Sequence, residues 1–599
     1  MNTTRMLPQG AASIALLLLA GTAGAQTIYV DTSADVTDFG GAQQVADLPG
    51  PDGKISLAEA GLASDNTPGV QTIGFHIPQS DWQMQWLYPG RAVLQPFLGF
   101  RVFETAIIDA TTQTAFTGET NPDGGAEVVI FTGSYLIDNV GGAMRGFDHT
   151  SISVSGGSGN VIQGNTVVNI EVYDSPSALI GGTNTGEGNT AGTIKLDRTN
   201  DCVVIGNTTT RVRVLGWVGG GQPATNNRIG GPTLAERNFI TGYGTWSEGC
   251  PGGTTVQIFD SIGTVVENNW IGTTPDGMAQ GSLASTTGVG LEGENHDTVV
   301  RDNRIAGILG HGTGPHCVGW LVGSAITVYG KGSGVLIVGN AIGLNANDEP
   351  VLGSVTGITM SNYFEGPVQD VVVGGTGPGE ANEIAGHLLT GVRVDNTFSG
   401  VRISANSIHD NGDLGIDLVT AGFQTGVTPN DTLDPDVGAN GLQNYPVLLA
   451  ASTSPAGTNV AGTLNALANQ SFSLEFFASS ACDPSGFGEG AVFLGAMEVT
   501  TDAAGDATFS AMLPVVASAG SFVTSTATLL PVGSTSEFSA CLPIAVQLLG
   551  DLDGSGGIDG ADLGALLGAW GPCSGCPADL NGDGAVDGAD LGMLLANWG

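Results

Sequence analysis

The sequence is poor in positive charge. Only 16 Lys and Arg stand against 57 Asp and Glu in 599 residues, which gives a formal net charge of −41. A nucleic-acid partner needs a basic surface to meet its phosphates, so this balance argues against nucleic acid. It argues equally against attraction to anionic membrane surfaces. The charge fits a soluble extracellular protein with a solvated, mutually repelling surface.

Long hydrophobic runs are also scarce. The run Ala11–Ala20 follows a single charge at Arg5 and precedes the small residues Ala23–Ala25. This order is typical of a secretory signal peptide, so we expect residues 1–25 to be removed before Gln26. No other stretch approaches the roughly 20 apolar residues that span a membrane. The sequence therefore predicts a secreted or cell-surface protein with no membrane span after cleavage.

Cysteine is sparse as well. Seven Cys fit an oxidising compartment but not a disulfide-dense scaffold. Cys482 and Cys541 lie in the same late segment and are the best disulfide candidates by position. The short Cys-Ser-Gly-Cys loop lacks the second Cys or His pair that a zinc site needs. The sequence assigns no pairing to the other five, which are Cys202, Cys250, Cys317, Cys573 and Cys576.

Glycine, in contrast, is abundant. The chain has 97 Gly, which suits tight turns because only Gly adopts positive φ at no steric cost. Short strands rich in Val and Ile alternate with such turns between Thr27 and Leu449, and no helix-period pattern of useful length interrupts them.

One pattern recurs along this region: a short alternating strand, an Asn, one more apolar residue and a Gly-rich turn. It is found at Ser333–Gly343, Ser399–Ile408, Val203–Asn207, Thr264–Ile271 and Thr298–Ile305. Such self-similarity predicts strands stacked coil on coil as a parallel β-helix with the apolar face inward. Each Asn tolerates the left-handed conformation and can hydrogen-bond the equivalent Asn of the next coil.

Longer phrases carry a resemblance to a known family. Ile180–Thr183 with Asn189, Ile229–Thr233 with Asn238, and Val373–Thr376 with Asn382 repeat one phrase; Ile271–Gly277 and Ile342–Asp348 repeat a second; Asn406–Leu418, Asn430–Asp431 and Leu442–Pro446 look like the end of the array. Together they resemble secreted bacterial right-handed β-helix proteins of the CSLREA-domain type, over most of residues 27–545. The resemblance implies a right-handed parallel β-helix over residues 106–450.

The segment 26–105 is similar to the phrase that starts such β-helices. Asp52–Ala60 keeps its Ser-Leu and Glu-Ala pairs, although Ile55 and Ala58 stand where the family has Cys and Arg. We expect a short capping helix from Ser56 to Leu62, with Ser56 as N-cap and Glu59 as its capping-box partner. A solenoid end needs such a cap because it otherwise exposes apolar edges.

Residues 451–546 change character. Alternating segments such as Phe472–Phe477 and Phe522–Ala527 are spaced as in a small antiparallel sandwich. They resemble the immunoglobulin-like β-sandwich that follows the β-helix in the same family, which implies a structural spacer.

Residues 548–599 contain two twelve-residue loops, the second 28 residues after the first. Oxygen ligands fall at loop positions 1, 3, 5, 9 and 12, a Gly stands at position 6, and position 7 offers its carbonyl, as in calcium-binding loops. The predicted Ca²⁺ ligands are Asp551, Asp553, Ser555, Gly557, Asp559 and Asp562 in the first loop, and Asp579, Asn581, Asp583, Ala585, Asp587 and Asp590 in the second. We therefore expect two Ca²⁺ sites. We also expect Ile558 and Val586, at position 8 of each loop, to pair with each other.

Each loop runs into a predicted helix with one apolar face. The faces are formed by Leu563, Leu566, Leu567 and Trp570, and by Leu591, Leu594, Leu595 and Trp598. Loop plus exit helix, duplicated, resembles a type I dockerin module. The resemblance implies a cohesin-like or cell-surface protein partner. However, Gly560-Ala561 and Gly588-Ala589 replace the family's usual hydroxyl pair at the partner-contacting positions.

The sequence identifies no catalytic residue. The best clusters are Glu292, Glu294, His296, Asp297, Arg301 and Asp302, which we expect to divide between faces, and His409, Asp410, Asp413 and Asp417, which we expect to serve turns. Gly310-His311-Gly312 matches one motif of polygalacturonase-type enzymes without the companion motifs, so we treat it as coincidence.

The fold prediction is thus all-β: a right-handed parallel β-helix, a small β-sandwich and a small α-helical dockerin-like module. The function hypothesis is an exported, calcium-binding β-helix protein that acts in adhesion, binding or structural display. The alternative is a polysaccharide-degrading enzyme, either a glycoside hydrolase or a polysaccharide lyase, carried by its dockerin. An extracellular polysaccharide is a candidate partner under both hypotheses.

Overall fold

The computed structural model describes residues 26–38, 40–97, 99–217, 221–242, 253–281, 285–308, 323–361, 368–420, 425–546, 548–553, 557–573 and 575–599. Strands dominate these residues and helices are few and short, so the expected all-β class is confirmed. The chain divides into two compact units, Met1–Thr150 and Ser151–Gly599. The predicted signal peptide, 1–25, lies outside the described residues. No helix in the described ranges is long and apolar enough to cross a membrane.

The first unit is built on parallel strands. One row runs β1 (Thr27–Val30), β2 (Gln71–Phe75), β5 (Ala106–Asp109) and β8 (Ala143–Arg145). Further parallel pairs join β3 (Ala92–Leu94) to β6 (Val128–Ile130), β6 to β9 (Phe147–Ser155), and β4 (Phe100–Val102) to β7 (Ser134–Ile137). The helices of this unit are α1 (Leu57–Asn66), α2 (Thr111–Thr117) and the 3₁₀ turns Val45–Asp47 and Gln79–Asp81.

Helix α1 begins where the sequence predicts. The Oγ of Ser56 accepts a hydrogen bond from the Glu59 backbone N–H at 3.2 Å, and the Glu59 carboxylate accepts one from the Ser56 N–H at 2.9 Å. This capping box satisfies two backbone donors at the helix start. The helix ends at Asn66, four residues beyond the predicted Leu62, and it packs on β1, β2 and β4. Its buried face consists of Leu57, Glu59, Ala60, Gly61, Ala63 and Ser64.

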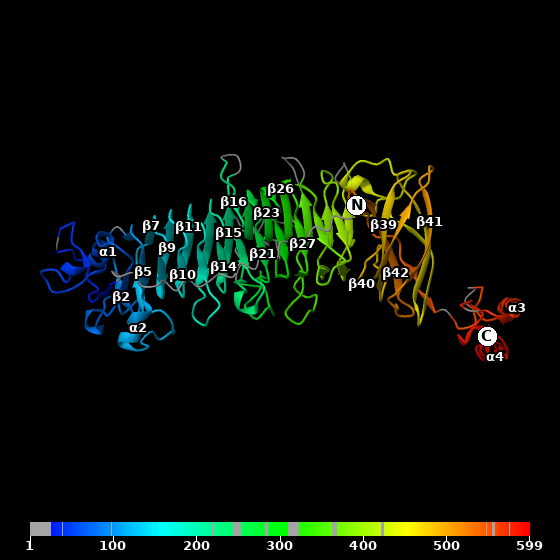
Figure 1. Cartoon of the computed structure of the whole chain (residues 1–599), viewed down its shortest axis with the longest axis horizontal. Helices are drawn as coiled ribbons and strands as arrows, with labels where there is room; N and C mark the ends of the chain where they lie inside the picture. Colours follow the sequence, from blue (N-terminus) through cyan, green and yellow to red (C-terminus); the bar gives the residue numbers. More distant parts are fainter. Residues whose placement is uncertain are drawn as a thin grey trace, which may run out of the picture. The chain divides into compact units, whose positions relative to one another are not determined.

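The second unit contains a stack of parallel strands in three rows, and Figure 1 shows β11, β15, β23 and β26 succeeding one another in one of them. The first row runs β10 (Val161–Gln163), β12 (Leu179–Gly181), β14 (Val203–Ile205), β17 (Arg228–Gly230), β21 (Val265–Glu267), β24 (Val299–Arg301), β27 (Leu336–Val338), β31 (Val372–Gly374) and β34 (Arg402–Ser404). The long-strand row runs β11 (Thr166–Tyr173), β13 (Thr190–Asp197), β15 (Thr208–Leu215), β19 (Thr254–Phe259), β23 (Thr287–His296), β26 (Ser324–Ser333), β29 (Thr356–Ser361), β33 (Val392–Val394) and β36 (Ile416–Leu418). The short-strand row runs β18 (Phe239–Ile240), β22 (Trp270–Ile271), β25 (Arg304–Ile305), β28 (Ala341–Ile342), β32 (Glu383–Ala385) and β35 (Ser407–His409).

From β17 onward the chain visits the first, short-strand and long-strand rows in turn. Three small strands add to the edges: β16 (Ala224–Thr225), β20 (Ser261–Ile262) and β30 (Val368–Gln369). The 3₁₀ turns are Leu234–Glu236 and Ala439–Leu442. Inside the first row, one register position is apolar and at most 3% exposed in every strand: Ile162, Ile180, Val204, Ile229, Val266, Val300, Ile337, Val373 and Ile403. This continuous apolar column is the core that the strand alternation predicts.

The predicted asparagine contacts form a buried ladder. Each member donates its backbone N–H and its side-chain amide to the Oδ1 of the next member. The members are Asn165, Asn189, Asn207, Asn238, Asn269, Asn303, Asn340, Asn382 and Asn406. The expectation that each Asn bonds to the equivalent Asn of the next coil is therefore confirmed.

Two four-stranded sheets follow the stack. One runs β41 (Asp506–Leu513), β38 (Gly457–Asn465), β37 (Val447–Ser454) and β44 (Ala545–Val546); the other runs β40 (Val492–Thr500), β39 (Ser471–Ser479), β42 (Phe522–Leu530) and β43 (Leu542–Pro543). Only β37 and β44 pair in parallel among these strands. Residues of both sheets share one core, including Val460 and Phe509 from the first, and Leu474 and Phe476 from the second. This arrangement is a two-sheet sandwich.

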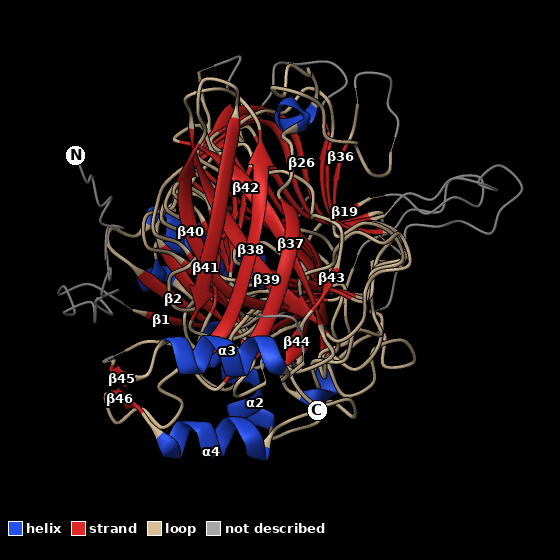
Figure 2. Cartoon of the chain, turned by 90° about the vertical axis from the view of Figure 1, so that its right-hand side faces the viewer, coloured by secondary structure: helices blue, strands red, loops and turns tan. Residues whose placement is uncertain are grey.

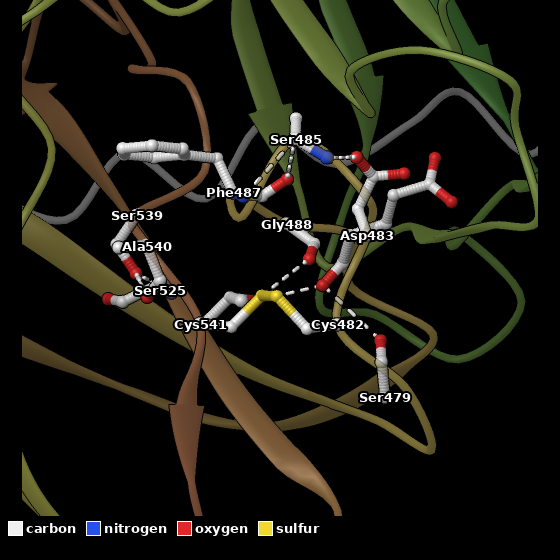
Figure 3. Close-up of a disulfide and its surroundings, with 12 residues drawn as sticks. Ser479, Cys482, Asp483, Ser485, Phe487, Gly488, Ser525, Ser539, Ala540 and Cys541 are labelled. Atoms are coloured by element: carbon white, nitrogen blue, oxygen red, sulfur yellow. Dashed lines mark hydrogen bonds between the residues drawn. A yellow bond between two sulfur atoms is a disulfide. The ribbon is translucent and has the colours of Figure 1, made fainter.

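A disulfide links the connection between β39 and β40 to the residue before β43. Cys482 and Cys541, the pair favoured by position, are joined with an S–S distance of 2.07 Å (Figure 3). The carbonyl oxygen of Gly488 lies 3.0 Å from the Cys541 sulfur. Because a disulfide sulfur carries no proton, this approach is a contact and not a hydrogen bond.

Three glutamates of the sandwich bond to the last strands of the stack. Glu475 accepts the N–H of Ala405 at 2.7 Å. Glu489 accepts the N–H and side-chain amide of Asn411 at 3.1 and 2.7 Å. Glu537 accepts the N–H of Leu418 at 3.0 Å and of Thr428 at 2.9 Å. We call Glu475, Glu489 and Glu537 the junction glutamates; all three are at most 6% exposed.

Candidate metal centre

The first twelve-residue loop gathers carboxylates. One oxygen each of Asp551, Asp553 and Asp562 lies within 4.8 Å of the others, a spacing that suits one metal ion. Ser555 lies outside the described residues. Hard oxygen donors of this kind match Ca²⁺, which takes six to eight oxygens. The donor set therefore fits the predicted ion.

The position-12 carboxylate holds this loop closed. Asp562 is fully buried and accepts the backbone N–H groups of Leu552, Asp553 and Asp559 at 2.7, 3.1 and 2.8 Å. The hydrogen bond from Asp559, together with the other two, lowers the pKa of Asp562 although burial opposes this shift. The residue thus stays ionised and tethers both ends of the loop, which is the state a metal ligand needs.

The second loop repeats these contacts. Asp590 is fully buried and accepts the N–H groups of Leu580, Asn581 and Asp587 at 2.7, 3.0 and 2.8 Å. Its pKa is lowered chiefly by the bond from Asp587. In two loops that are 28 residues apart, the position-12 carboxylate therefore accepts the same three backbone hydrogen bonds.

Backbone turns orient the remaining oxygens of the second loop. Asp579 accepts the N–H groups of Asp583 and Gly584 at 3.1 and 2.8 Å, and Asn581 accepts that of Asp583 at 2.9 Å. These bonds fold the side chains at positions 1 and 3 toward the loop interior, where Ca²⁺ ligands lie. Asp587, the predicted ligand at position 9, also caps the following helix, because its carboxylate accepts a hydrogen bond from the Ala589 N–H at 2.7 Å.

Each loop ends in a helix, α3 (Gly560–Gly568) or α4 (Gly588–Ala596). Figure 2 shows the two helices side by side, with β45 (Gly571–Pro572) and β46 (Ala585–Val586) at one end. The expectation that Ile558 and Val586 pair between the loops is wrong for the backbone. Val586 pairs with Gly571, and the carbonyl of Ile558 accepts the N–H of Gly599 at 3.3 Å.

The reason for this difference is a crossed arrangement of the two halves. Gly571 and Gly599 occupy equivalent places, each thirteen residues after the position-8 residue of its own loop. Gly571, which follows α3, pairs with Val586 of the second loop, and Gly599, which follows α4, bonds to Ile558 of the first loop. The residues that follow each helix therefore connect that half of the module to the predicted calcium-binding loop of the other half. Ile558 and Val586 still meet as side chains in one core with Leu566, Ala578 and Leu594.

The predicted apolar helix faces are only partly buried. Leu566 and Leu594 are fully buried. Leu567 and Trp570 on one side, and Leu595 and Trp598 on the other, remain 46–51% exposed. Each half of the module therefore leaves one Leu and one Trp half-exposed at equivalent positions.

The other cysteines have separate outcomes. Cys573 and Cys576, whose pairing the sequence left open, are joined by a disulfide beside the second loop. Cys202 is buried as a free thiol, and burial raises its pKa. Cys250 and Cys317 lie outside the described residues.

The 292–302 cluster divides between two strands. Glu292, Glu294 and His296 lie on β23, and all three are partly buried. Glu294 bonds to His296 at 3.3 Å and to Lys331 at 3.3 Å, and these contacts lower its pKa, the bond from His296 most of all. Asp297 follows the strand in a left-handed turn. Arg301 lies on β24 and pairs with a carboxylate of the neighbouring strand, Glu267; Asp302 follows it.

Sequence reasoning missed the partners of Glu292. Its carboxylate accepts hydrogen bonds from Thr254 at 2.9 Å and from Gln257 at 2.6 Å. Strand alternation was the available signal, because buried Val256 and Ile258 place Gln257 on the outward face between them.

The 409–417 cluster is held by turn and junction contacts. His409 contacts Asp410 at 2.8 Å and Glu383 at 3.4 Å. Asp417 is buried, which raises its pKa to about 6, and it accepts the N–H of Gly426 at 3.1 Å. Asp413 donates its backbone N–H to a loop carbonyl. The Gly310-His311-Gly312 motif lies outside the described residues.

Two small packing gaps lie between the last strands and the sandwich. Most of their lining is apolar, with Phe538 common to both, and they contain none of the 292–302 carboxylates.

Comparison of the sequence with protein-family models gives no match, and comparison with curated proteins gives none either.

Proposed function

We propose that this chain is an exported, calcium-binding protein of the secreted or cell-surface kind, acting in adhesion, binding or structural display. Its stack is a right-handed parallel β-helix of the CSLREA type, its sandwich is a spacer, and its last 52 residues are a dockerin-like module. The three rows, visited in turn and joined only by parallel pairs, support the β-helix.

The observation that carries the proposal is the hydrogen-bond pattern that the two loops share. Asp562 and Asp590 make equivalent sets of three backbone hydrogen bonds, 28 residues apart. A solvated acidic tail has no reason to repeat such geometry. The bound ion would neutralise the gathered carboxylates, which repel one another without it.

The half-exposed Leu567 and Leu595 on α3 and α4, and the half-exposed Trp570 and Trp598 just after those helices, support docking to a cohesin-like or cell-surface protein. An extracellular polysaccharide is the partner we propose for the stack. We do not extend the proposal to polysaccharide cleavage, because Glu292, Glu294 and Asp417 are engaged by neighbouring side chains or backbone.

Calcium titration tests the proposal. Calorimetry on the full chain, first stripped with chelator, should give two Ca²⁺ sites. Asp562→Ala and Asp590→Ala should each remove one site, because each replaces the carboxylate that closes one loop. Asp506→Ala, an exposed residue of β41, is the matched control and should leave both sites intact. A chain that binds no Ca²⁺, or variants that keep both sites, would contradict the assignment.

A further inference from the structure

The two halves of the C-terminal module differ by one covalent bond. The half that contains the second loop carries the Cys573–Cys576 disulfide directly before that loop. The residues 28 positions earlier, before the first loop, are Ala545 and Leu548, so no equivalent bond can form there. Two loops that share one hydrogen-bond pattern are therefore held by different means, and the difference lies beside predicted calcium ligands.

One end of the disulfide supports the start of the second loop. The carbonyl oxygen of Cys576 accepts the N–H of Asp579, the predicted ligand at position 1, at 3.1 Å. The first loop has the same contact, since the carbonyl oxygen of Leu548 accepts the N–H of Asp551 at 3.0 Å. The position-1 residue of each loop is thus bonded to the residue three positions before it, but only in the second loop is that residue part of a disulfide.

The other end of the disulfide supports the middle of the same loop. The N–H of Cys573 donates to the carbonyl oxygen of Gly584, at position 6, at 2.9 Å. The preceding residue, Pro572, pairs with Ala585, whose carbonyl is the predicted ligand at position 7. Ala545, the counterpart of Cys573, belongs instead to β44 of the sandwich and pairs with β37. The disulfide therefore connects position 1 of the second loop to positions 6 and 7.

Both cysteines are accessible to a reductant. Cys573 and Cys576 are partly exposed, and Gly575 between them is exposed. The two cysteines also pack against the small core that contains Val586 and Leu594. Thiol–disulfide exchange needs a thiolate to reach one of the two sulfurs, which this position at the surface of the module permits.

Reduction would change this link and leave every predicted ligand atom in place. The disulfide takes up two electrons and two protons and becomes two thiols, while a dithiol reductant gives up the same electrons and protons and becomes a disulfide. Cys573 and Cys576 can then separate, so positions 1 and 7 of the loop are less often at the spacing that one ion requires. Ion binding must then supply this ordering, which lowers the affinity.

We infer that the Cys573–Cys576 disulfide makes the second loop a redox-sensitive calcium site. In the oxidised chain the disulfide holds the second loop in a shape that suits the ion; in the reduced chain this site weakens, and the first loop keeps its affinity. The inference deepens the proposed function and rests on it in one respect, namely that both loops bind Ca²⁺. An exported chain in an oxidising medium then has two tight sites.

The test is a calorimetric Ca²⁺ titration of the full chain without residues 1–25, stripped with chelator, before and after reduction with dithiothreitol and removal of the excess. Alkylation and mass spectrometry identify the cysteines that have been reduced. We expect one of the two sites to weaken by roughly tenfold or more, because a short covalent constraint is lost. Asp562→Ala, which keeps the second loop, should show this weakening. Asp590→Ala, which keeps the first loop, should not.

Two double variants serve as controls. Cys573→Ser with Cys576→Ser should bind Ca²⁺ as the reduced parent does, and its affinities should not respond to dithiothreitol. Cys482→Ser with Cys541→Ser removes the disulfide of the sandwich. This variant should keep two sites of parental affinity, one of which still weakens on reduction. Because the parent is compared with itself in two redox states, the result does not depend on the folding of either variant.

Three results would overturn the inference: free thiols at Cys573 and Cys576 in the air-oxidised chain, equal affinities before and after their reduction, or weakening of the site that Asp590→Ala retains. The same titration separates the two proposals. Two sites that are indifferent to the redox state would remove only the inference about the disulfide. A chain that binds no Ca²⁺ in either state would remove the proposed calcium sites together with it.

Discussion

At the scale of the residue, the buried asparagines explain how short strands stay in register. An asparagine side chain carries both an acceptor and a donor, so its oxygen can receive two hydrogen bonds from one neighbour while its amide nitrogen donates to the next. Asn269 accepts from Asn238 and donates to Asn303, and its amide also bonds to the carbonyls of Ile229 and Glu267. The ladder thus satisfies corner backbone groups that no strand partner reaches.

Replacing one member should destabilise the stack. Asn269→Ala leaves several buried polar groups without partners, and each costs roughly 1–3 kcal/mol. We expect a lower midpoint of thermal unfolding, measured by circular dichroism. Asn347→Ala, in an exposed turn, is the control and should leave the midpoint unchanged. An equal midpoint for the parent and Asn269→Ala would show that the ladder does not contribute to stability.

At the scale of the element, the junction glutamates accept hydrogen bonds from backbone N–H groups at the end of the stack. The final strand of a parallel stack has N–H groups that point to no further strand, and burying them unpaired is costly. Glu475, Glu489 and Glu537 accept such groups from the last turns of the stack. The ionised carboxylates of these glutamates lose hydration because they are buried between the stack and the sandwich. Burial consequently raises the pKa of Glu475, raises that of Glu489 to about 7, and raises that of Glu537 to about 8, where the charge of Asp417 adds to the effect.

This junction should weaken as pH rises. A carboxyl whose pKa is higher in the folded state stabilises the fold fully below its unfolded pKa, and that contribution is lost as pH rises through the folded pKa. For Glu537 the window runs from about 4.5 to about 8. Glu537→Gln cannot ionise, so its unfolding midpoint should fall less than that of the parent between pH 5 and pH 9. Glu498→Gln, on the exposed face of β40, should keep the parental dependence. Parallel pH curves for parent and Glu537→Gln would contradict this account.

Local signals in the sequence predicted much at this scale. The strand–Asn–turn repeat predicted the ladder, and the Ser56–Glu59 spacing predicted the start of α1, because both depend on neighbours in the chain or on a fixed repeat. The junction glutamates and the crossing of Gly571 and Gly599 were not predicted. Glu489 and Asn411 are 78 residues apart, and nothing local distinguishes Glu489 from a solvated acid.

At the scale of the whole molecule, stability comes from two different sources. The stack rests on a continuous apolar column and on neutral amide bonds between adjacent strands, neither of which involves a metal. The C-terminal module has a small buried core of five residues, and its first loop brings three carboxylates together. Because such a core supplies little stability by itself, bound Ca²⁺ should decide whether the module stays folded.

Calcium should therefore protect one part of the chain and leave the other unchanged. At a free Ca²⁺ concentration 100-fold above Kd, each site adds about 2.7 kcal/mol to the folded state. Hydrogen exchange, followed by mass spectrometry on the full chain, should slow in peptides from 557–573 and 575–599 when Ca²⁺ replaces chelator. Peptides from the asparagine ladder should exchange at the same rate in both conditions. Asp562→Ala with Asp590→Ala should abolish the difference in the module, because both loops lose the carboxylate that closes them. Equal protection of stack and module by Ca²⁺ would mean that the ion stabilises the acidic surface in general, and absence of protection in the module would remove calcium from its folding.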